Sequence, residues 1–148
     1  MKIKLIVVGK TRSKFLIEGE KVYSERLKHY CKFTEFIIPD VKNSGKLSIL
    51  ELKNKEGESI LSAINNSAEV ILLDENGSSF SSIEFSNFIN KKILSSNKEL
   101  VFVVGGAFGF SDQVYKRSNS KLSLSKMTFS HQMIRLFFKE QLYRSHTI

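Results

Sequence analysis

Residues 99–111, ELVFVVGGAFGFS, give the strongest indication of the fold class. Residues 100–104 are entirely apolar, as expected of a strand that is buried on both faces of a parallel sheet. The run ends on Gly105, Gly106 and Gly109. Glycines after a buried strand let the backbone turn tightly or approach a bound molecule closely. These residues alone therefore fit both a small-molecule site at the carboxyl edge of a sheet and a simple tight turn.

Apolar runs and helical periodicity alternate on both sides of this stretch. Ser81 and Glu84 have the spacing of a capping box and predict the start of one helix. The alternation predicts an α/β fold with a mainly parallel sheet and helices on both faces, and no linker divides residues 1–148 into two domains. The predicted strands are 2–8, 33–38, 69–73, 100–104 and 122–124, and the predicted helices are 14–30, 47–64, 81–93, 111–117 and 131–146.

The composition is that of an ordinary soluble globular protein, with 41% hydrophobic and 26% charged residues. The N-terminus reads as a first strand rather than a signal peptide, and no apolar run is long enough to span a membrane, so we expect a cytoplasmic protein. The single cysteine predicts that there is no internal disulfide, and the three histidines are too widely separated to predict a metal site. The net charge of +8 favours a polyanionic partner.

Three predicted strand ends are candidates for one pocket. They are residues 73–77, where Leu73 and Asp74 run into a turn, the glycine loop at 105–109, and residues 123–129. Because the carboxyl ends of parallel strands lie at one edge of a sheet, loops that are distant in sequence can converge there. Turn formation is a sufficient explanation for each loop taken singly. The glycine loop matches neither a GxGxxG fingerprint nor a P-loop.

The ordered set of these segments resembles a known family. LLDENG at 72–77 and FVVGGAFGF at 102–110 are followed by KLSLSKMTFSHQMIR at 121–135 and LFFKEQLYR at 136–144. The set closely resembles the ribosomal RNA large subunit methyltransferase H family, which belongs to the SPOUT class. The resemblance covers essentially the whole chain, including KIKLIVVGK at 2–10 and KEGE at 55–58.

The resemblance implies both an architecture and an activity. The architecture is an α/β fold with a trefoil knot in its C-terminal part, working as a homodimer without a metal. The activity is methyl transfer from S-adenosylmethionine to N3 of a pseudouridine in helix 69 of large-subunit (23S) rRNA, on assembled ribosomes. Members of the family normally carry a further tail with a Tyr-His pair, to which none of these 148 residues is assigned. A SPOUT enzyme acting on another RNA, and a non-catalytic ribosome- or RNA-binding protein, are the alternatives.

The resemblance also implies site residues. The apolar members of the cofactor set could wall an adenine slot, although for Leu73 and Leu124 taken alone core packing is the favoured explanation. The implied cofactor contacts are Leu73, Gly105, Leu124, Ser125, Lys126, Met127, Thr128 and Phe129.

Polar side chains on the last predicted helix are the catalytic candidates. His131, Arg135 and Lys139 have i, i+4 spacing and share one helix face, which predicts either a basic stripe for RNA phosphate or a solvated surface. We take His131, Arg135 and Arg144 as the catalytic set. Arg144 could act on phosphate or across a dimer, or it could pair with Glu140 one turn away.

Overall fold

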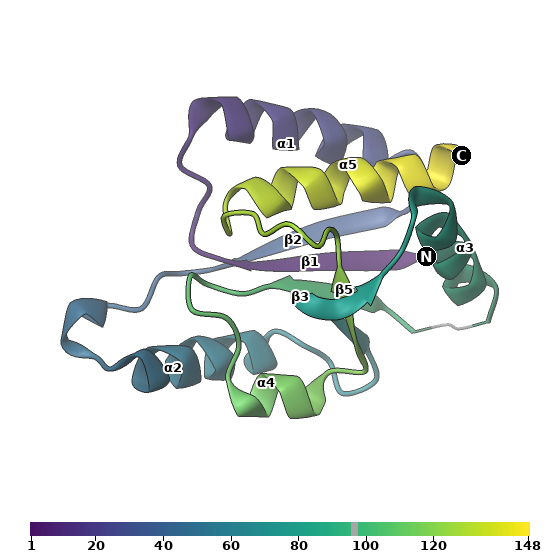
Figure 1. The fold of residues 1–148 in the computed structure, drawn as a ribbon. Helices are drawn as coiled ribbons and strands as arrows, with labels where there is room; N and C mark the ends of the chain where they lie inside the picture. The colour runs from purple at the N-terminus through teal and green to yellow at the C-terminus, as the bar shows by residue number, and fades with distance from the viewer. Residues whose placement is uncertain (96–97) are drawn as a thin grey trace.

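A computed structural model describes residues 1–95 and 98–148, and Figure 1 shows its arrangement in layers. The strands of the described part form one sheet in the order β2-β1-β4-β3-β5, and every neighbouring pair is parallel. The predicted α/β fold with a mainly parallel sheet is therefore confirmed. The C-terminal knot stays a prediction. The strands are β1 (Lys2–Val8), β2 (Lys32–Ile38), β3 (Glu69–Ser79), β4 (Leu100–Val104) and β5 (Ser120–Ser123).

Helices cover both faces of this sheet, as predicted. In Figure 1, α1, α3 and α5 lie on one side of it, and α2 and α4 lie on the other. A short 3₁₀ turn, η1, precedes α2. The bounds are α1 (Lys14–Leu27), η1 (Ser44–Lys46), α2 (Ile49–Ser62), α3 (Ser82–Ser95), α4 (Asp112–Arg117) and α5 (Met133–Thr147).

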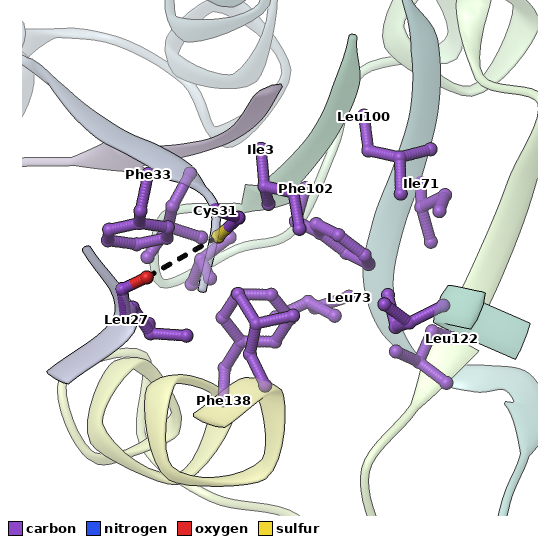
Figure 2. Close-up of a cluster of buried hydrophobic side chains, with 14 of the residues drawn as sticks. Ile3, Leu27, Cys31, Phe33, Ile71, Leu73, Leu100, Phe102, Leu122 and Phe138 are labelled. Atoms are coloured by element: carbon purple, nitrogen blue, oxygen red, sulfur yellow. Dashed lines mark hydrogen bonds between the residues drawn. The ribbon is translucent and has the colours of Figure 1, made fainter. Parts of the chain in front are cut away.

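The sheet separates two hydrophobic cores because successive residues of a strand point to opposite faces. On β4, Leu100, Phe102 and Val104 belong to the core under α1, α3 and α5, whereas Val101 and Val103 belong to the core over α2 and α4. All of β4 is buried, which explains its unbroken apolar sequence. Figure 2 shows the first core.

Aromatic packing joins α5 to the centre of that core. The rings of Phe102 and Phe138 lie 4.7 Å apart between centroids, and both side chains are fully buried (Figure 2). Cys31 lies at the edge of the same core, where its thiol sulfur is 3.7 Å from the Leu27 carbonyl oxygen. Burial raises the pKa of this thiol to about 11, so Cys31 is an unreactive packing residue.

The capping box before α3 is confirmed, because the Ser81 amide donates to Glu84 Oε1 at 2.8 Å and the Glu84 amide donates to Ser81 Oγ at 3.1 Å. The predicted turn at 74–77 is wrong. β3 continues to Ser79, with a register shift in which Leu122 of β5 pairs with both Leu73 and Ser78. The residues that read as a turn therefore form an irregularity inside the strand.

The basic face predicted on the last helix points into the protein. His131, Arg135 and Lys139 do lie along one side of the segment, but Arg135 is 0% exposed and Lys139 is 2% exposed. The prediction of a phosphate-binding or solvated stripe is therefore wrong for these two residues. Lys139 Nζ lies 3.0 Å from Glu20 Oε1 of α1 and 2.9 Å from Glu35 Oε2 of β2. A buried ammonium needs carboxylates of this kind around it.

Arg135 is held by backbone oxygens at the carboxyl end of β1. Its guanidinium donates to the carbonyls of Val8 and Gly9, both at 2.7 Å, and to Thr11 Oγ1 at 3.2 Å. Its Nε also donates to the His131 carbonyl at 3.0 Å. The end of the first strand and the start of the last helix are thereby fixed to each other.

We expect Lys139→Ala to lower the free energy of unfolding by about 3–5 kcal/mol, because it leaves Glu20 and Glu35 without their buried cation. Urea unfolding followed by circular dichroism measures the loss. Lys21→Ala removes an exposed cation from α1 and should change stability by less than about 0.5 kcal/mol. A loss for Lys139→Ala as small as that of the control would contradict this account of how α5 is anchored.

Candidate functional site

The irregular part of β3 and the segments that follow β4 and β5 surround one cleft of about 540 Å³. β3 contributes residues 73–76, β4 contributes 104–110, and β5 with the segment after it contributes 122–125 and 127–131. The prediction that these three strand ends converge is confirmed. Parallel pairing of β3 with both β4 and β5 brings them together at one edge of the sheet.

The glycine loop after β4 forms a tight turn, and its backbone also packs closely against neighbouring side chains. Gly109 has φ +87°, and its amide donates to the Gly106 carbonyl at 3.2 Å, which closes the turn. A Cβ atom on Gly105 would lie 3.1 Å from the ring of Phe110, and one on Gly106 would lie 2.7 Å from Glu56 Oε1. Larger side chains would have to displace both neighbours.

The predicted cofactor residues lie in the cleft with one exception. Leu73, Gly105, Leu124, Ser125, Met127, Thr128 and Phe129 all line it, whereas Lys126 does not. The bend in this segment is held by two hydrogen bonds, from Ser123 Oγ to the Ser125 carbonyl at 2.8 Å and from the Met127 amide to Ser125 Oγ at 3.0 Å.

The apolar members of the set differ in what they do besides lining the cleft. Leu73 is buried in the core under α5, and Leu124 packs against that core, so for these two residues both the packing and the lining interpretations apply. Met127 is 76% exposed and Phe129 is exposed as well, although its ring lies 4.7 Å from that of Phe137. Core packing does not account for an exposed Met127, whereas a cleft wall does.

The first catalytic candidate, His131, lies where three cavities meet. It lines the main cleft and also two smaller cavities that Asp40 and Arg12 line with it. Burial and then the nearby Arg135 lower the pKa of His131, while Asp40 acts in the opposite direction. The imidazole is therefore neutral at pH 7 and can accept or donate a hydrogen bond.

The two arginine candidates do not line the cleft. Arg135 lies behind His131 and binds its carbonyl, as described above. Arg144 lies near the other end of α5 and forms the predicted i, i+4 pair with Glu140, in which Arg144 Nε donates to Glu140 Oε1 at 3.0 Å. Within the part of the chain described, no cluster of His, Cys, Asp and Glu could hold a metal ion.

Three residues at the site were missed by sequence reasoning. Tyr115 of α4 closes one wall of the cleft, and its hydroxyl donates to Asp74 Oδ2 at 2.5 Å. Burial and then this hydrogen bond raise the pKa of Tyr115 to about 12. Glu56 of α2 and Asp40 after β2 face the glycine loop and His131 from the opposite side. Glu56 lies within the KEGE segment, but nothing in that segment predicts a role for its carboxylate.

No helix among residues 1–95 and 98–148 combines the length and the apolar character that crossing a bilayer would take.

Comparison with known proteins covers the whole chain. A family model described as "Predicted SPOUT methyltransferase" matches residues 1–148. Proteins named ribosomal RNA large subunit methyltransferase H are similar to it at 57% identity in Christiangramia forsetii, 56% in Flavobacterium psychrophilum and 53% in Parabacteroides distasonis. Each alignment spans 148 residues, which is 100% of this chain and 94% of the relative.

We expect His131 to titrate below the ordinary histidine value of about 6.5, and Asp40→Asn to lower its pKa further, because a nearby carboxylate favours the imidazolium. Histidine Cε1 chemical shifts followed by NMR from pH 4 to 9 measure both midpoints. Asp112→Asn removes an exposed carboxylate from α4 and should leave the midpoint unchanged. An upward shift in Asp40→Asn would show that Asp40 does not act on His131.

Proposed function

This chain belongs to the SPOUT methyltransferase family, and within it to the ribosomal RNA large subunit methyltransferase H group; from that membership we propose that it methylates large-subunit ribosomal RNA. The observation that carries the proposal is full-length identity of 50% and more to proteins of that name, combined with a strand-end cleft built from the segments that carry the resemblance. We propose that residues 1–148 work as one domain in the cytoplasm, where ribosomes are found.

We propose S-adenosylmethionine as the methyl donor, bound in the main cleft. A volume of about 540 Å³ lies within the range of small-molecule sites, and the wall combines apolar side chains with the backbone of Gly105. Leu73, Leu124 and Met127 supply an apolar surface for adenine, and the strand-end backbone supplies donors and acceptors for its edge. When bound, the cofactor supplies an activated methyl group on a sulfonium, so the protein's task is to bind, orient and exclude water.

We propose N3 of a pseudouridine in helix 69 of assembled ribosomes as the target. Two features of the chain support an RNA substrate: the net charge of +8, and the names of its relatives. Phosphate attraction supplies affinity without sequence preference, so a single small domain has to recognise its RNA largely by shape.

We propose a role for each of the three catalytic candidates, and their positions in the structure support it. His131 is a polar group at the cleft with a lowered pKa, and we propose that it orients the target base. Arg135 acts indirectly, by holding the His131 carbonyl against the end of β1. Arg144 has an exposed guanidinium and binds RNA phosphate or the second subunit, because pairing with Glu140 leaves part of it at the surface.

We propose that the protein acts as a homodimer through the outer side of α1. Phe15 is 65% exposed, and Val22, two turns further along the same face, is exposed as well. Between them in sequence, Gly19 faces α5, because a Cβ atom on it would lie 3.0 Å from Leu136 Cδ1. The helices α1 and α5 lie side by side in Figure 1. Apolar side chains grouped in this way are typical of an interface.

Met127→Glu is expected to weaken S-adenosylmethionine binding at least about tenfold, because it puts a carboxylate into the apolar wall of the adenine slot. Folding should be unaffected, since the side chain is exposed. Titration calorimetry measures the affinity. Leu94→Glu introduces the same charge at an exposed apolar residue outside the cleft and should bind like the wild type. Equal affinity in both variants would refute the assignment of this cleft to the cofactor.

Light scattering at micromolar concentration should give about twice the mass of the 16.9 kDa chain. The double variant Phe15→Glu, Val22→Glu should give the monomer mass, because four carboxylates would meet across a two-fold interface. The Leu94→Glu variant again serves as the control and should remain dimeric. A wild-type monomer would contradict the dimer, and a dimer that survives the double variant would contradict this interface.

A further inference from the structure

The glycine loop carries two phenylalanines in opposite environments. Phe110 is 6% exposed, and its ring packs edge to face against Tyr115, with 5.7 Å between the centroids. Phe108 is 52% exposed, belongs to neither hydrophobic core and stacks on no other aromatic ring within residues 1–95 and 98–148. Single exposed apolar side chains are common on protein surfaces, so it is the position of Phe108 that indicates its use.

The backbone that carries Phe108 is fixed on both sides of it. After it, Gly109 adopts φ +87°, and its amide donates to the Gly106 carbonyl at 3.2 Å. Before it, Gly105 is buried, and a Cβ atom there would lie 3.1 Å from the ring of Phe110. The loop therefore holds Phe108 in a defined place, and a ligand that contacts its ring does not have to order the backbone first.

Phe108 lies at the outer part of the main cleft. It lines that cleft together with Phe129, which follows β5, is 40% exposed and has its ring 4.7 Å from that of Phe137. The proposed cofactor contacts Leu73 and Gly105 are buried, so they lie deeper in the same cleft. A molecule that approaches the cofactor from solvent therefore meets exposed aromatic side chains first.

The side chains of this cleft suit a flat ring better than a phosphate. Among the residues that the structure describes, no lysine or arginine lines the cleft, although the whole chain carries a net charge of +8. Proteins recognise unstacked RNA bases by stacking them on aromatic side chains. A base that is modified within a folded RNA has to leave its own stack, and an aromatic ring of the enzyme replaces part of the stacking that is lost.

We propose that the target nucleobase stacks on the side of the Phe108 ring that faces the main cleft, and that this contact positions the ring nitrogen for methylation. The inference rests on the proposed function and adds to it a residue that binds the substrate base. Base and methyl donor then lie in one cleft, so the nitrogen can approach the methyl carbon directly. His131 lines the same cleft and offers a hydrogen bond to the edge of the base.

The test replaces Phe108 with alanine, leucine and tyrosine. Leucine keeps an apolar side chain without a flat face, whereas tyrosine keeps the flat face. For each variant, single-turnover methylation of ribosomes that lack this modification is measured against ribosome concentration at saturating S-adenosylmethionine. We expect Phe108→Ala and Phe108→Leu to lower the second-order rate constant for ribosomes at least about tenfold, and Phe108→Tyr to stay within about threefold of the wild type.

Phe36→Ala is the matched control. Phe36 is 45% exposed on β2 and does not line the cleft, so its loss should leave the rate constant unchanged. Titration calorimetry with S-adenosylmethionine and the melting temperature are measured for every variant. Both should be unchanged in the Phe108 variants, because the side chain is exposed and is not among the proposed cofactor contacts.

The outcomes separate the inference from the proposed function. A wild type that neither binds S-adenosylmethionine nor methylates ribosomes refutes the proposed function itself. Given an active wild type, the inference is overturned if Phe108→Ala keeps its rate constant or if Phe108→Leu is as active as Phe108→Tyr. A loss of cofactor affinity or of melting temperature in Phe108→Ala also overturns it, because Phe108 would then support the cofactor or the fold rather than the base.

Discussion

The last helix is held against the first strand by an arginine. Its guanidinium donates to backbone carbonyls at the end of that strand, as a further paired strand would. At the carboxyl end of β1 the carbonyls of Val8 and Gly9 point toward α5, and the guanidinium of Arg135 donates to both. One turn further along, Lys139 lies between the carboxylates of Glu20 and Glu35. Charged groups that are buried this deeply are stable only when paired, so α5 can dock in one position.

The position of α5 in turn determines the site. Residues 124–132 connect β5 to α5. They must span the gap between two fixed ends, and most of them line the cleft. Gln132 strengthens the connection, because its amide nitrogen donates to the Lys10 carbonyl and its amide oxygen accepts from the Arg12 amide. His131 is thereby held between the main cleft and the cavity that Glu56 lines, and a movement of its backbone would break the Arg135 contact.

Much of the fold was predictable, because hydrophobic periodicity and burial have the same cause. β4 is apolar throughout because it has helices on both faces, and the strand ends converge because parallel strands share an edge. The direction of α5 was not predictable. Spacing identifies which residues share a helix face, but a charged face usually points to solvent. Here the charged face is buried because carboxylates pair with it, and those carboxylates lie far away in sequence. The 74–77 segment was misread as a turn for a related reason. Gly77 lets β5 approach so closely that pairing resumes after the irregularity.

The two sides of the site also differ in how well the sequence predicts them. The residues that line the main cleft lie next to their own strands in sequence, so the strand pattern predicted which segments meet there, and the family resemblance supplied the individual residues. The opposite side brings α2 and the end of β2 to the glycine loop, and only the three-dimensional structure shows that Glu56 faces Gly106.

The hydrogen bond between the Arg135 side chain and the Val8 carbonyl also constrains the order in which the fold can form during synthesis. The two residues are 127 positions apart, so the first strand to leave the ribosome is among the last to have its carbonyls satisfied. Contacts of such long range make folding slow, and until they form β1 presents unpaired polar groups at its end. A nascent chain that ends before Arg135 therefore has neither the donor for these carbonyls nor the helix that holds the segment after β5 in place.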